Sequence, residues 1–156
     1  CLNCTAGTYQ SSEQATTCDT CGTGQHQDES GKLLCKHCIE GKTMASNGAV
    51  DCLDCTPGKY QDDAKSTTCK DCSAGQHQGN SGTQTCIPCR KGEYMTSKGA
   101  VRCLNCNPGT ISDTTGLQKC DDCLVGTFRE GSSTDFTKCD LCPIGYSQSD
   151  QGTTFW

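Results

Sequence analysis

Cysteine is the residue whose number and spacing could do the most chemistry in this chain. The sequence has 18 cysteines among 156 residues, arranged as nine C-x2-C pairs. Eight pairs begin 17 residues apart, from Cys1 to Cys120, and the ninth begins at Cys139 after a two-residue insertion. Cysteines in such pairs form disulfides, bind zinc or act as redox catalysts. The rest of the sequence helps to distinguish between these three kinds of chemistry.

Zinc is the main alternative to disulfides, because C-x2-C-x13-C-x2-C lies within the spacing of tetrahedral Cys4 sites. Four such sites would use eight of the nine pairs, and neither the basic face nor the local apolar core of zinc modules is visible. Redox catalysis needs an activated thiolate, commonly at a helix N-terminus, and no helix of useful length is readable. No catalytic triad, carboxylate pair or phosphate-binding loop stands out. We therefore expect no enzymatic activity, no cofactor and no bound metal.

The sequence lacks the apolar residues of an ordinary hydrophobic core. Leu, Ile, Val and Phe together make up 18 of the 156 residues, which is close to the level of disordered chains. Disulfides must therefore replace burial, and a bridge that closes a loop of ~15 residues stabilises a fold by roughly 3 kcal/mol. Because bridges in such number persist in oxidising compartments, we expect an extracellular or cell-surface protein.

Charge and hydropathy argue against two kinds of partner. The net charge is −5, whereas nucleic-acid binding needs a basic surface. No apolar run is long enough to span a bilayer, so we expect no direct insertion into a membrane. The chain opens at Cys1 in full repeat register, without an initiator methionine or a signal peptide. We therefore expect a processed protein or a segment of a longer one.

The cysteine pairs belong to a larger repeat of 51 residues, three pairs at a time. Residues 1–51 and 52–102 align without a gap and are identical at 25 of 51 positions, and residues 103–156 form a divergent third copy. We predict three cysteine-rich modules with these boundaries. A fixed period without linkers favours an array whose repeats contact mainly their neighbours over three independent domains.

Each 17-residue repeat predicts a small β-hairpin. In all nine repeats a glycine follows the second cysteine by three positions and turns the chain. An alternating stretch such as Lys59-Tyr60-Gln61 then forms a short strand, and a second turn such as Asn47-Gly48 stands four residues before the next cysteine. The predicted fold class is a small disulfide-rich protein. It is an elongated array of short β-hairpin units held by a disulfide ladder, with little secondary structure and no helix.

The second residue after the first glycine is mostly flat or bulky, as in Tyr9, His26 and Tyr60. We expect these side chains to pack on the neighbouring disulfide and to form a small core in each repeat. A role as pH sensors or metal ligands exists for His26 and His77. Both residues take a place that tyrosine fills in other repeats, which favours packing.

The pattern from Cys55 to Tyr60, cysteine-x2-Gly-x-Tyr closing on a cysteine 14 residues after Cys55, resembles the A1-type module of tumour necrosis factor receptor cysteine-rich domains. The tandem C-x2-C-x2-G arrangement of all nine repeats is similar to the ephrin-receptor-like cysteine-rich repeats of eukaryotic extracellular proteins. It is also similar to cysteine-rich surface proteins of protists, notably over residues 126–142. These resemblances imply a disulfide-laddered rod and specify no ligand.

The resemblance also implies a disulfide pairing. In the A1-type module, the cysteine before x-x-Gly-x-Tyr bonds the next cysteine downstream. Carried over repeat by repeat, this gives the bridges Cys4–Cys18, Cys21–Cys35, Cys38–Cys52, Cys55–Cys69, Cys72–Cys86, Cys89–Cys103, Cys106–Cys120 and Cys123–Cys139. A crossed scheme, which begins with Cys1–Cys18 and Cys4–Cys21, stays open as the alternative.

Serial pairing leaves Cys1 and Cys142 without a partner, and Trp156 occupies the slot where Cys142 would find a downstream cysteine. We expect both cysteines to bond other chains or residues outside this segment. Phe155 and Trp156 would form an assembly contact with a neighbouring repeat. Asn3 lies in the sequon Asn3-Cys4-Thr5, which allows a glycan there.

The regularity of the chain favours a structural role. We expect a non-enzymatic extracellular rod that self-associates as a homo-oligomer or filament, in a fibre, surface appendage or coat. One alternative is a receptor or adhesion ectodomain that binds a protein ligand, with Phe128, Phe136 and Tyr146 as an exposed anchor patch in the irregular last repeats. The second alternative is a zinc-binding array of C-x2-C pairs.

Overall fold

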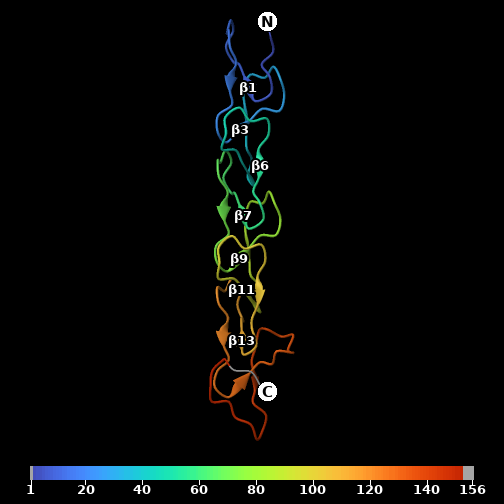
Figure 1. Cartoon of the computed structure of the whole chain (residues 1–156), viewed down its shortest axis with the longest axis vertical. Coiled ribbons are helices and arrows are strands. Elements are labelled where there is room, and N and C mark those ends of the chain that lie inside the picture. Colours follow the sequence, from blue (N-terminus) through green and yellow to red (C-terminus); the bar gives the residue numbers. More distant parts are fainter. Residues whose placement is uncertain (1, 153–156) are drawn as a thin grey trace. The chain divides into compact units, whose positions relative to one another are not determined.

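The structure is a computed structural model and describes residues 2–152. These residues contain sixteen two-residue strands and no helix, and so none that is long and apolar enough to cross a membrane. The chain divides into two compact units, Cys1–Asp71 with Asn80–Thr85, and Cys72–Gly79 with Cys86–Trp156. The first unit contains β1 to β8 and the second contains β9 to β16 (Figure 1). The three-module boundaries of the sequence stay a prediction.

Each hairpin pairs a strand that follows a turn with the two residues between the cysteines of the next C-x2-C pair. All eight pairs are antiparallel. In the first unit they are β1 (Thr8–Tyr9) with β2 (Asp19–Thr20), β3 (Gln25–His26) with β4 (Lys36–His37), β5 (Lys42–Thr43) with β6 (Leu53–Asp54), and β7 (Lys59–Tyr60) with β8 (Lys70–Asp71). In the second unit they are β9 (Gln76–His77) with β10 (Ile87–Pro88), β11 (Glu93–Tyr94) with β12 (Leu104–Asn105), β13 (Thr110–Ile111) with β14 (Asp121–Asp122), and β15 (Thr127–Phe128) with β16 (Asp140–Leu141).

Backbone hydrogen bonds link each repeat to the next around one residue, the glycine three positions after the second cysteine, which we call the turn glycine. In the first unit, the Gly41 N–H donates to the Gln61 carbonyl at 2.7 Å, and the Gly41 carbonyl accepts from the Cys55 N–H at 2.9 Å. In the second unit, Gly75 makes the equivalent bonds at 2.7 and 2.9 Å. Within each unit these repeats are thus tied to their successors through main-chain atoms, independently of side-chain type.

Two separate constraints require glycine at these turns. The φ angle of Gly41 is +81°, in the left-handed region that costs other residues roughly 1–2 kcal/mol. A Cβ added to Gly41 would also lie 2.2 Å from the Gly82 carbonyl oxygen, and one added to Gly75 would lie 2.1 Å from that of Gly116. The close approach explains why the turn position tolerates no side chain, which the turn argument from sequence alone did not reveal.

Except in the eighth repeat, the second turn also uses the left-handed region, at a position that we call the loop position, four residues before the next bridged cysteine. Gly48 has a φ of +71° there, and its N–H donates to the Cys21 carbonyl at 2.7 Å. Gln14 and Lys65, which replace the loop glycine in the first and fourth repeats, keep this conformation with φ angles of +62° and +60°. The backbone geometry therefore prevails over the residue type.

The core consists of a line of cysteines and one further residue per repeat. The second cysteine of each of the first eight pairs is buried, and Cys21, Cys38, Cys55, Cys72 and Cys89 are fully so. The further residue is the third after the turn glycine, which we call the inner position. From the second repeat to the eighth, its buried occupants are Gln27, Met44, Gln61, Gln78, Met95, Ser112 and Arg129.

The small core expected around Tyr9, His26 and Tyr60 is therefore displaced by one residue. Side chains at that position, the second after the turn glycine, are half-buried, with Thr43 as a buried and Ser147 as an exposed exception. The expected packing on a neighbouring disulfide is found for His26 and His77, whose Nδ1 atoms each lie 3.2 Å from a bridge sulfur. The centre of the core is nevertheless the next residue, which sequence reasoning missed because it is mostly polar. The predicted fold class, short hairpins held by a disulfide ladder without a helix, is confirmed for the described residues.

Candidate functional site in the disulfide ladder and the last repeats

Eight disulfides close the hairpins of residues 2–152. Each joins the second cysteine of one C-x2-C pair to the first cysteine of the next. The bridges are Cys4–Cys18, Cys21–Cys35, Cys38–Cys52, Cys55–Cys69, Cys72–Cys86, Cys89–Cys103, Cys106–Cys120 and Cys123–Cys139. They are the same pairs as in the serial scheme. The two cysteines of a C-x2-C pair thus belong to different bridges, and the Cys4 sets of a zinc array are not formed.

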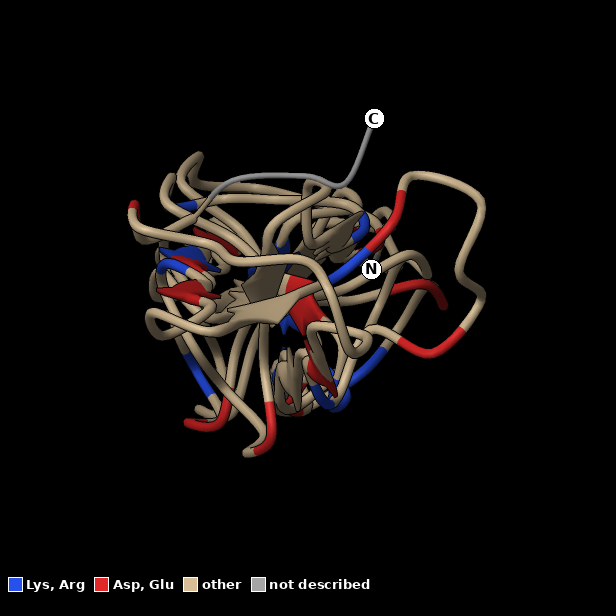
Figure 2. Cartoon of the chain, turned by 90° about the horizontal axis from the view of Figure 1, so that it is seen from below, with Lys and Arg blue, Asp and Glu red and all other residues tan. Residues whose placement is uncertain are grey.

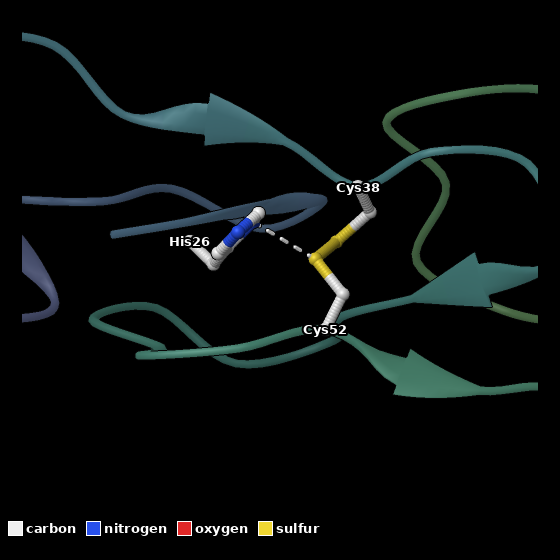
Figure 3. Close-up of side chains that lie close together, drawn as sticks. All are labelled: His26, Cys38 and Cys52. Atoms are coloured by element: carbon white, nitrogen blue, oxygen red, sulfur yellow. Dashed lines mark hydrogen bonds between the residues drawn. A yellow bond between two sulfur atoms is a disulfide. The ribbon is translucent and has the colours of Figure 1, made fainter. Parts of the chain in front are cut away.

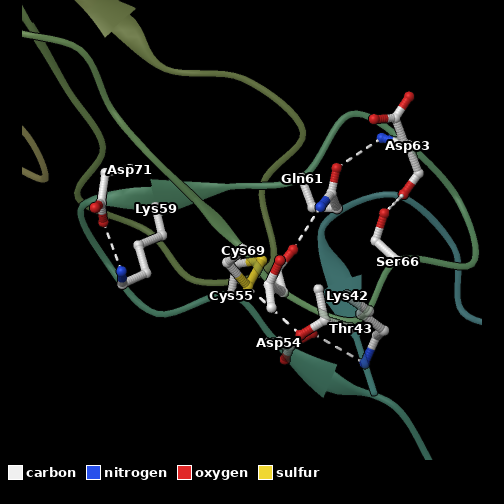
Figure 4. The surroundings of a disulfide bond; sticks show 11 residues. Lys42, Thr43, Asp54, Cys55, Lys59, Gln61, Asp63, Ser66, Cys69 and Asp71 are labelled. Carbon is white, nitrogen blue, oxygen red and sulfur yellow. Dashed lines mark hydrogen bonds and ion pairs between the residues drawn. A yellow bond between two sulfur atoms is a disulfide. The ribbon is translucent and has the colours of Figure 1, made fainter. Parts of the chain in front are cut away.

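Buried glutamines tie the hairpin loops to themselves. The side chain of Gln61 is 2% exposed. Its Nε2 donates to the Thr68 carbonyl at 2.6 Å, and its Oε1 accepts from the Asp63 N–H at 2.9 Å (Figure 4). Gln27 makes the same two bonds in its own loop. Sequence reasoning missed this role, although the recurrence of glutamine three residues after the turn glycine was a signal for it.

Exposed ion pairs join the two strands of some hairpins, and positive and negative side chains are mixed along them. Lys59 of β7 faces Asp71 of β8 at 2.5 Å, and Lys42 of β5 faces Asp54 of β6 at 2.9 Å (Figure 4). The hydrogen bond to Asp54 raises the pKa of Lys42. Blue segments of Lys and Arg and red segments of Asp and Glu are interspersed over the chain (Figure 2). Exposed pairs of this kind contribute little to stability.

The eighth repeat, Cys123–Cys139, departs from the others at its loop position. Counted back from Cys139, that position is Asp135, which is absent from the residues with a positive φ. Its N–H donates to Ser133 Oγ at 3.3 Å, and its carboxylate accepts from the N–H and the hydroxyl of Thr137. These hydrogen bonds lower the pKa of Asp135. The loop therefore lacks the main-chain bond that a loop glycine makes to the previous repeats.

The side chain of Arg129 compensates for this missing bond. Arg129 occupies the inner position of the eighth repeat and is 1% exposed. Its Nη2 donates to the carbonyls of Cys106, at 2.7 Å, and Asn107, and its Nε donates to the Thr110 carbonyl at 2.8 Å. Burial lowers the pKa of the guanidinium. In other repeats the corresponding cysteine carbonyl accepts the loop N–H, as Cys55 accepts from Gly82 at 2.8 Å.

Phe136 completes this exceptional repeat and corrects the predicted anchor patch. The Arg129 guanidinium lies 4.7 Å from the centroid of the Phe136 ring, a cation–π contact. Phe136 and Phe128 are half-buried, so only Tyr146 of the three aromatic residues is exposed, at 64%. The patch was wrong because the guanidinium and the neighbouring turn engage Phe136 within the fold. Sequence analysis did not single out Arg129. The sequence did offer one signal for it, because Arg129 is the one arginine among the inner residues of the repeats.

Exposed apolar side chains nevertheless gather in the last two repeats. Leu124, Val125, Leu141 and Ile144 are 58–104% exposed. Leu124 and Val125 directly follow one cysteine pair, and Leu141 and Ile144 flank Cys142 and Pro143 of the next. The equivalents of Leu124 in the regular repeats include Thr5 and Ser73, but also Ile39, which is 61% exposed. Exposed apolar side chains are therefore not confined to this end of the sequence.

The remaining predicted site residues lie at the ends of the chain. Cys142 is a half-buried free thiol, and Asn3 is exposed next to the turn at Gly31. Cys1, Phe155 and Trp156 lie outside the described residues. The inter-chain bonds of Cys1 and Cys142, the assembly contact of Phe155 and Trp156 and the glycan at Asn3 stay predictions.

Comparison with protein families agrees with this architecture. The family model described as tyrosine-protein kinase ephrin type A/B receptor-like matches residues 41–84, 77–116 and 109–155. The chain belongs to the ephrin-receptor-like family of cysteine-rich repeats, as the resemblance predicted. No curated protein matches the chain significantly. The family and the many disulfides indicate an extracellular, disulfide-rich module of a kind that is not typically catalytic.

Proposed function

We propose that the chain is a structural element of the cell exterior, an extended array that serves as a rod in a fibre, appendage or coat. The observation that carries this proposal is the recurrence of the same main-chain bonds from repeat to repeat. Gly24, Gly41, Gly75 and Gly92 each donate to the inner residue of the next repeat at 2.7 Å. A structure whose contacts are made by the backbone and by disulfides supports length and stiffness, and it leaves side chains free to vary.

Self-association through the terminal repeats is part of the proposal. The described part of the second unit gives no main-chain partner to the Gly145 N–H, although Gly145 has the turn conformation, with a φ of +90°. Cys142 carries a free thiol in the register of a bridging cysteine. A further repeat would find both the bridge and the main-chain bonds that an internal repeat finds. Cys1 of a second copy would supply the cysteine, and Phe155 and Trp156 would add the apolar contact.

Small-angle scattering and sedimentation of the chain with its bridges intact test this function. Nine repeats that each advance by about 10 Å form a rod of roughly 90 Å, with a radius of gyration near 26 Å, against ~15 Å for a compact globule of this length. We expect polymers that are lost in C142S and C1S and weakened in W156A. A compact monomer in which Cys1 and Cys142 are bonded to each other would contradict the proposal.

A second candidate function, adhesion to a protein ligand, is supported by the exposed apolar residues of the last two repeats. Leu124, Val125 and Ile144 would form the centre of such a contact, because exposed apolar side chains favour burial against a partner. The double substitution V125S/I144S separates the two functions. If the rod is the function, assembly through Cys142 persists in this variant. If adhesion is the function, binding of the monomeric chain to cell surfaces is lost.

A further inference from the structure

Two of the eight bridges have a histidine against them. In the first unit, His26 Nδ1 lies 3.2 Å from the Sγ atom of Cys52, in the Cys38–Cys52 bridge (Figure 3). In the second unit, His77 Nδ1 lies 3.2 Å from the Sγ atom of Cys103, in the Cys89–Cys103 bridge. In each set, the histidine nitrogen and the two sulfur atoms all lie within 4.8 Å of one another. A soft-metal ligand set is thus gathered at two places.

A thioether adds to the donor set. Met44 is buried and packs against Cys38 and Cys52 in one apolar cluster. Met95, also buried, occupies the equivalent inner position of the repeat that the Cys89–Cys103 bridge closes. Thiolate and thioether sulfur with an imidazole nitrogen are ligands that Zn2+ and Cu+ prefer.

The neighbouring bridge shows what the same place looks like without this chemistry. At the position equivalent to His26, Thr43 Oγ1 lies 3.6 Å from the Sγ atom of Cys69. The inner residue of the repeat that this bridge closes is Gln61, whose amide is hydrogen-bonded to its own loop. A hydroxyl and a bonded amide are poor ligands for a soft cation. The Cys55–Cys69 bridge is therefore a matched reference within the same chain.

We propose that these two sets are latent binding sites for a soft closed-shell cation, Zn2+ or Cu+, which form when a thiol reduces the bridge. Two molecules of a low-molecular-weight thiol reduce Cys38–Cys52 to two cysteine thiols and leave as their own disulfide. The cation then replaces the two thiol protons, which pass to water. The imidazole of His26 is the third ligand, and the thioether sulfur of Met44 can act as a fourth.

Little movement is needed to form the site. Metal–ligand distances of about 2.0–2.3 Å place the ligand atoms of a tetrahedral site roughly 3.5–4 Å apart. The histidine nitrogen lies 3.2 Å from the nearer sulfur atom, only slightly closer than this range, so that mainly the two bonded sulfur atoms must separate. The other bridges keep the repeats folded meanwhile. Cys103 is half-buried and Cys52 is buried, so we expect the second site to open at lower thiol concentration than the first.

Differential alkylation in a thiol–disulfide buffer tests the proposal, with Zn2+ alone as the probe. The buffer is set so that each bridge is open in a small minority of molecules. Free cysteines are then labelled with and without Zn2+ and located by peptide mapping, and bound zinc is counted by dialysis. A metal that binds only the open form shifts the equilibrium toward it. We therefore expect Zn2+ to raise, by tenfold or more, the fraction of chains in which Cys38/Cys52 and Cys89/Cys103 are reduced dithiols rather than disulfides. Two zinc ions per chain should be bound.

Variants in the full chain make the test specific. H26Y and H77Y, which install the tyrosine that other repeats carry, should each remove one zinc ion and its Zn2+-dependent opening while the hairpins stay folded. The double variant T43H/Q61M should create a third site at Cys55–Cys69. The proposal is overturned if Zn2+ opens all bridges alike, if H26Y and H77Y bind zinc as the parent does, or if no bridge responds to Zn2+.

Discussion

The repeat closed by Cys55–Cys69 and the repeat closed by Cys123–Cys139 solve the same structural problem in different ways. In the first, Lys65 takes a left-handed conformation so that its N–H reaches the Cys38 carbonyl at 2.7 Å. In the second, the loop is two residues longer, and the Arg129 side chain bonds the corresponding Cys106 carbonyl. What is maintained in both is satisfaction of a cysteine carbonyl.

The comparison teaches where this fold permits variation. The main-chain ladder and the bridges set the distance between repeats, and both repeats keep them. The loop between the inner position and the next cysteine changes in length and sequence once another donor reaches the carbonyl. An array of this kind can therefore carry local specialisation in one loop without loss of its regular core.

The largest expected effect comes from the turn glycines, where the eighth repeat differs most from a regular repeat such as the one closed by Cys72–Cys86. G75A combines a positive φ with a Cβ that would lie 2.1 Å from the Gly116 carbonyl oxygen, whereas G126A meets no described atom within 4 Å. We expect G75A to cost about 2–5 kcal/mol and G126A about 1–2 kcal/mol. Chemical denaturation with the bridges intact measures the difference. Equal losses would contradict the close approach.

The next effect concerns Arg129. R129A removes the donors of three carbonyls and the contact with Phe136, and we expect a loss of about 2–4 kcal/mol. Q61A removes two bonds of a regular loop and should cost about 1–2 kcal/mol. Thermal unfolding of both variants, with R129K as a charge-preserving control, ranks them. An R129A loss no larger than that of Q61A would mean that the guanidinium does not replace the loop bond.

Sequence reasoning reached the repeats, the hairpins and both turns because glycine and cysteine impose their geometry directly. It did not reach the inner position, since Gln27 and Gln61 are polar and a pattern search for burial favours apolar residues. It also did not reach Lys65, whose left-handed backbone is imposed by bonds to other repeats. Arg129 was hidden for the same reason, because its partners Cys106 and Thr110 belong to earlier repeats. Contacts between repeats are tertiary information that a single repeat does not contain.

A smaller effect follows for the regular loops that lack a loop glycine. K65G and Q14G relieve a left-handed conformation worth roughly 1–2 kcal/mol, and the greater freedom of glycine in the unfolded chain offsets part of it. We therefore expect each to stabilise the chain by about 0.5–1 kcal/mol. K98G, at a loop residue without a positive φ, is the control and should not stabilise. Midpoints of urea unfolding compare the three variants, and destabilisation by K65G would refute the imposed conformation.

The smallest effect distinguishes the two regions by pH and salt. The hydrogen bond from Lys70 lowers the pKa of Asp62, and hydrogen bonds from Thr137 lower that of Asp135, each from an ordinary value of 3.8. Because the folded pKa lies below the unfolded one, both groups add stability above that value and lose it as the pH falls through the folded pKa. We expect modest acid destabilisation in the parent that is reduced in D62N and D135N.

Salt separates the two carboxylates. The exposed pair of Asp62 and Lys70, at 2.5 Å, is screened at high ionic strength. Asp135 is held mainly by short-range hydrogen bonds from Thr137, and its ion pair with Lys138 is longer, at 3.7 Å. Thermal midpoints measured in low and high salt should therefore converge more strongly for D62N and its parent than for D135N and its parent. The same salt response in both variants would show that the two loops do not differ in this way.

Disulfide mapping of the native chain by mass spectrometry, without reduction, tests the central claim most directly. The account predicts peptides that join Cys21 to Cys35 and Cys38 to Cys52, so that the cysteines of every internal C-x2-C pair lie in different bridges. Crossed bridges such as Cys4–Cys21, or bridges within a C-x2-C pair, would contradict the ladder.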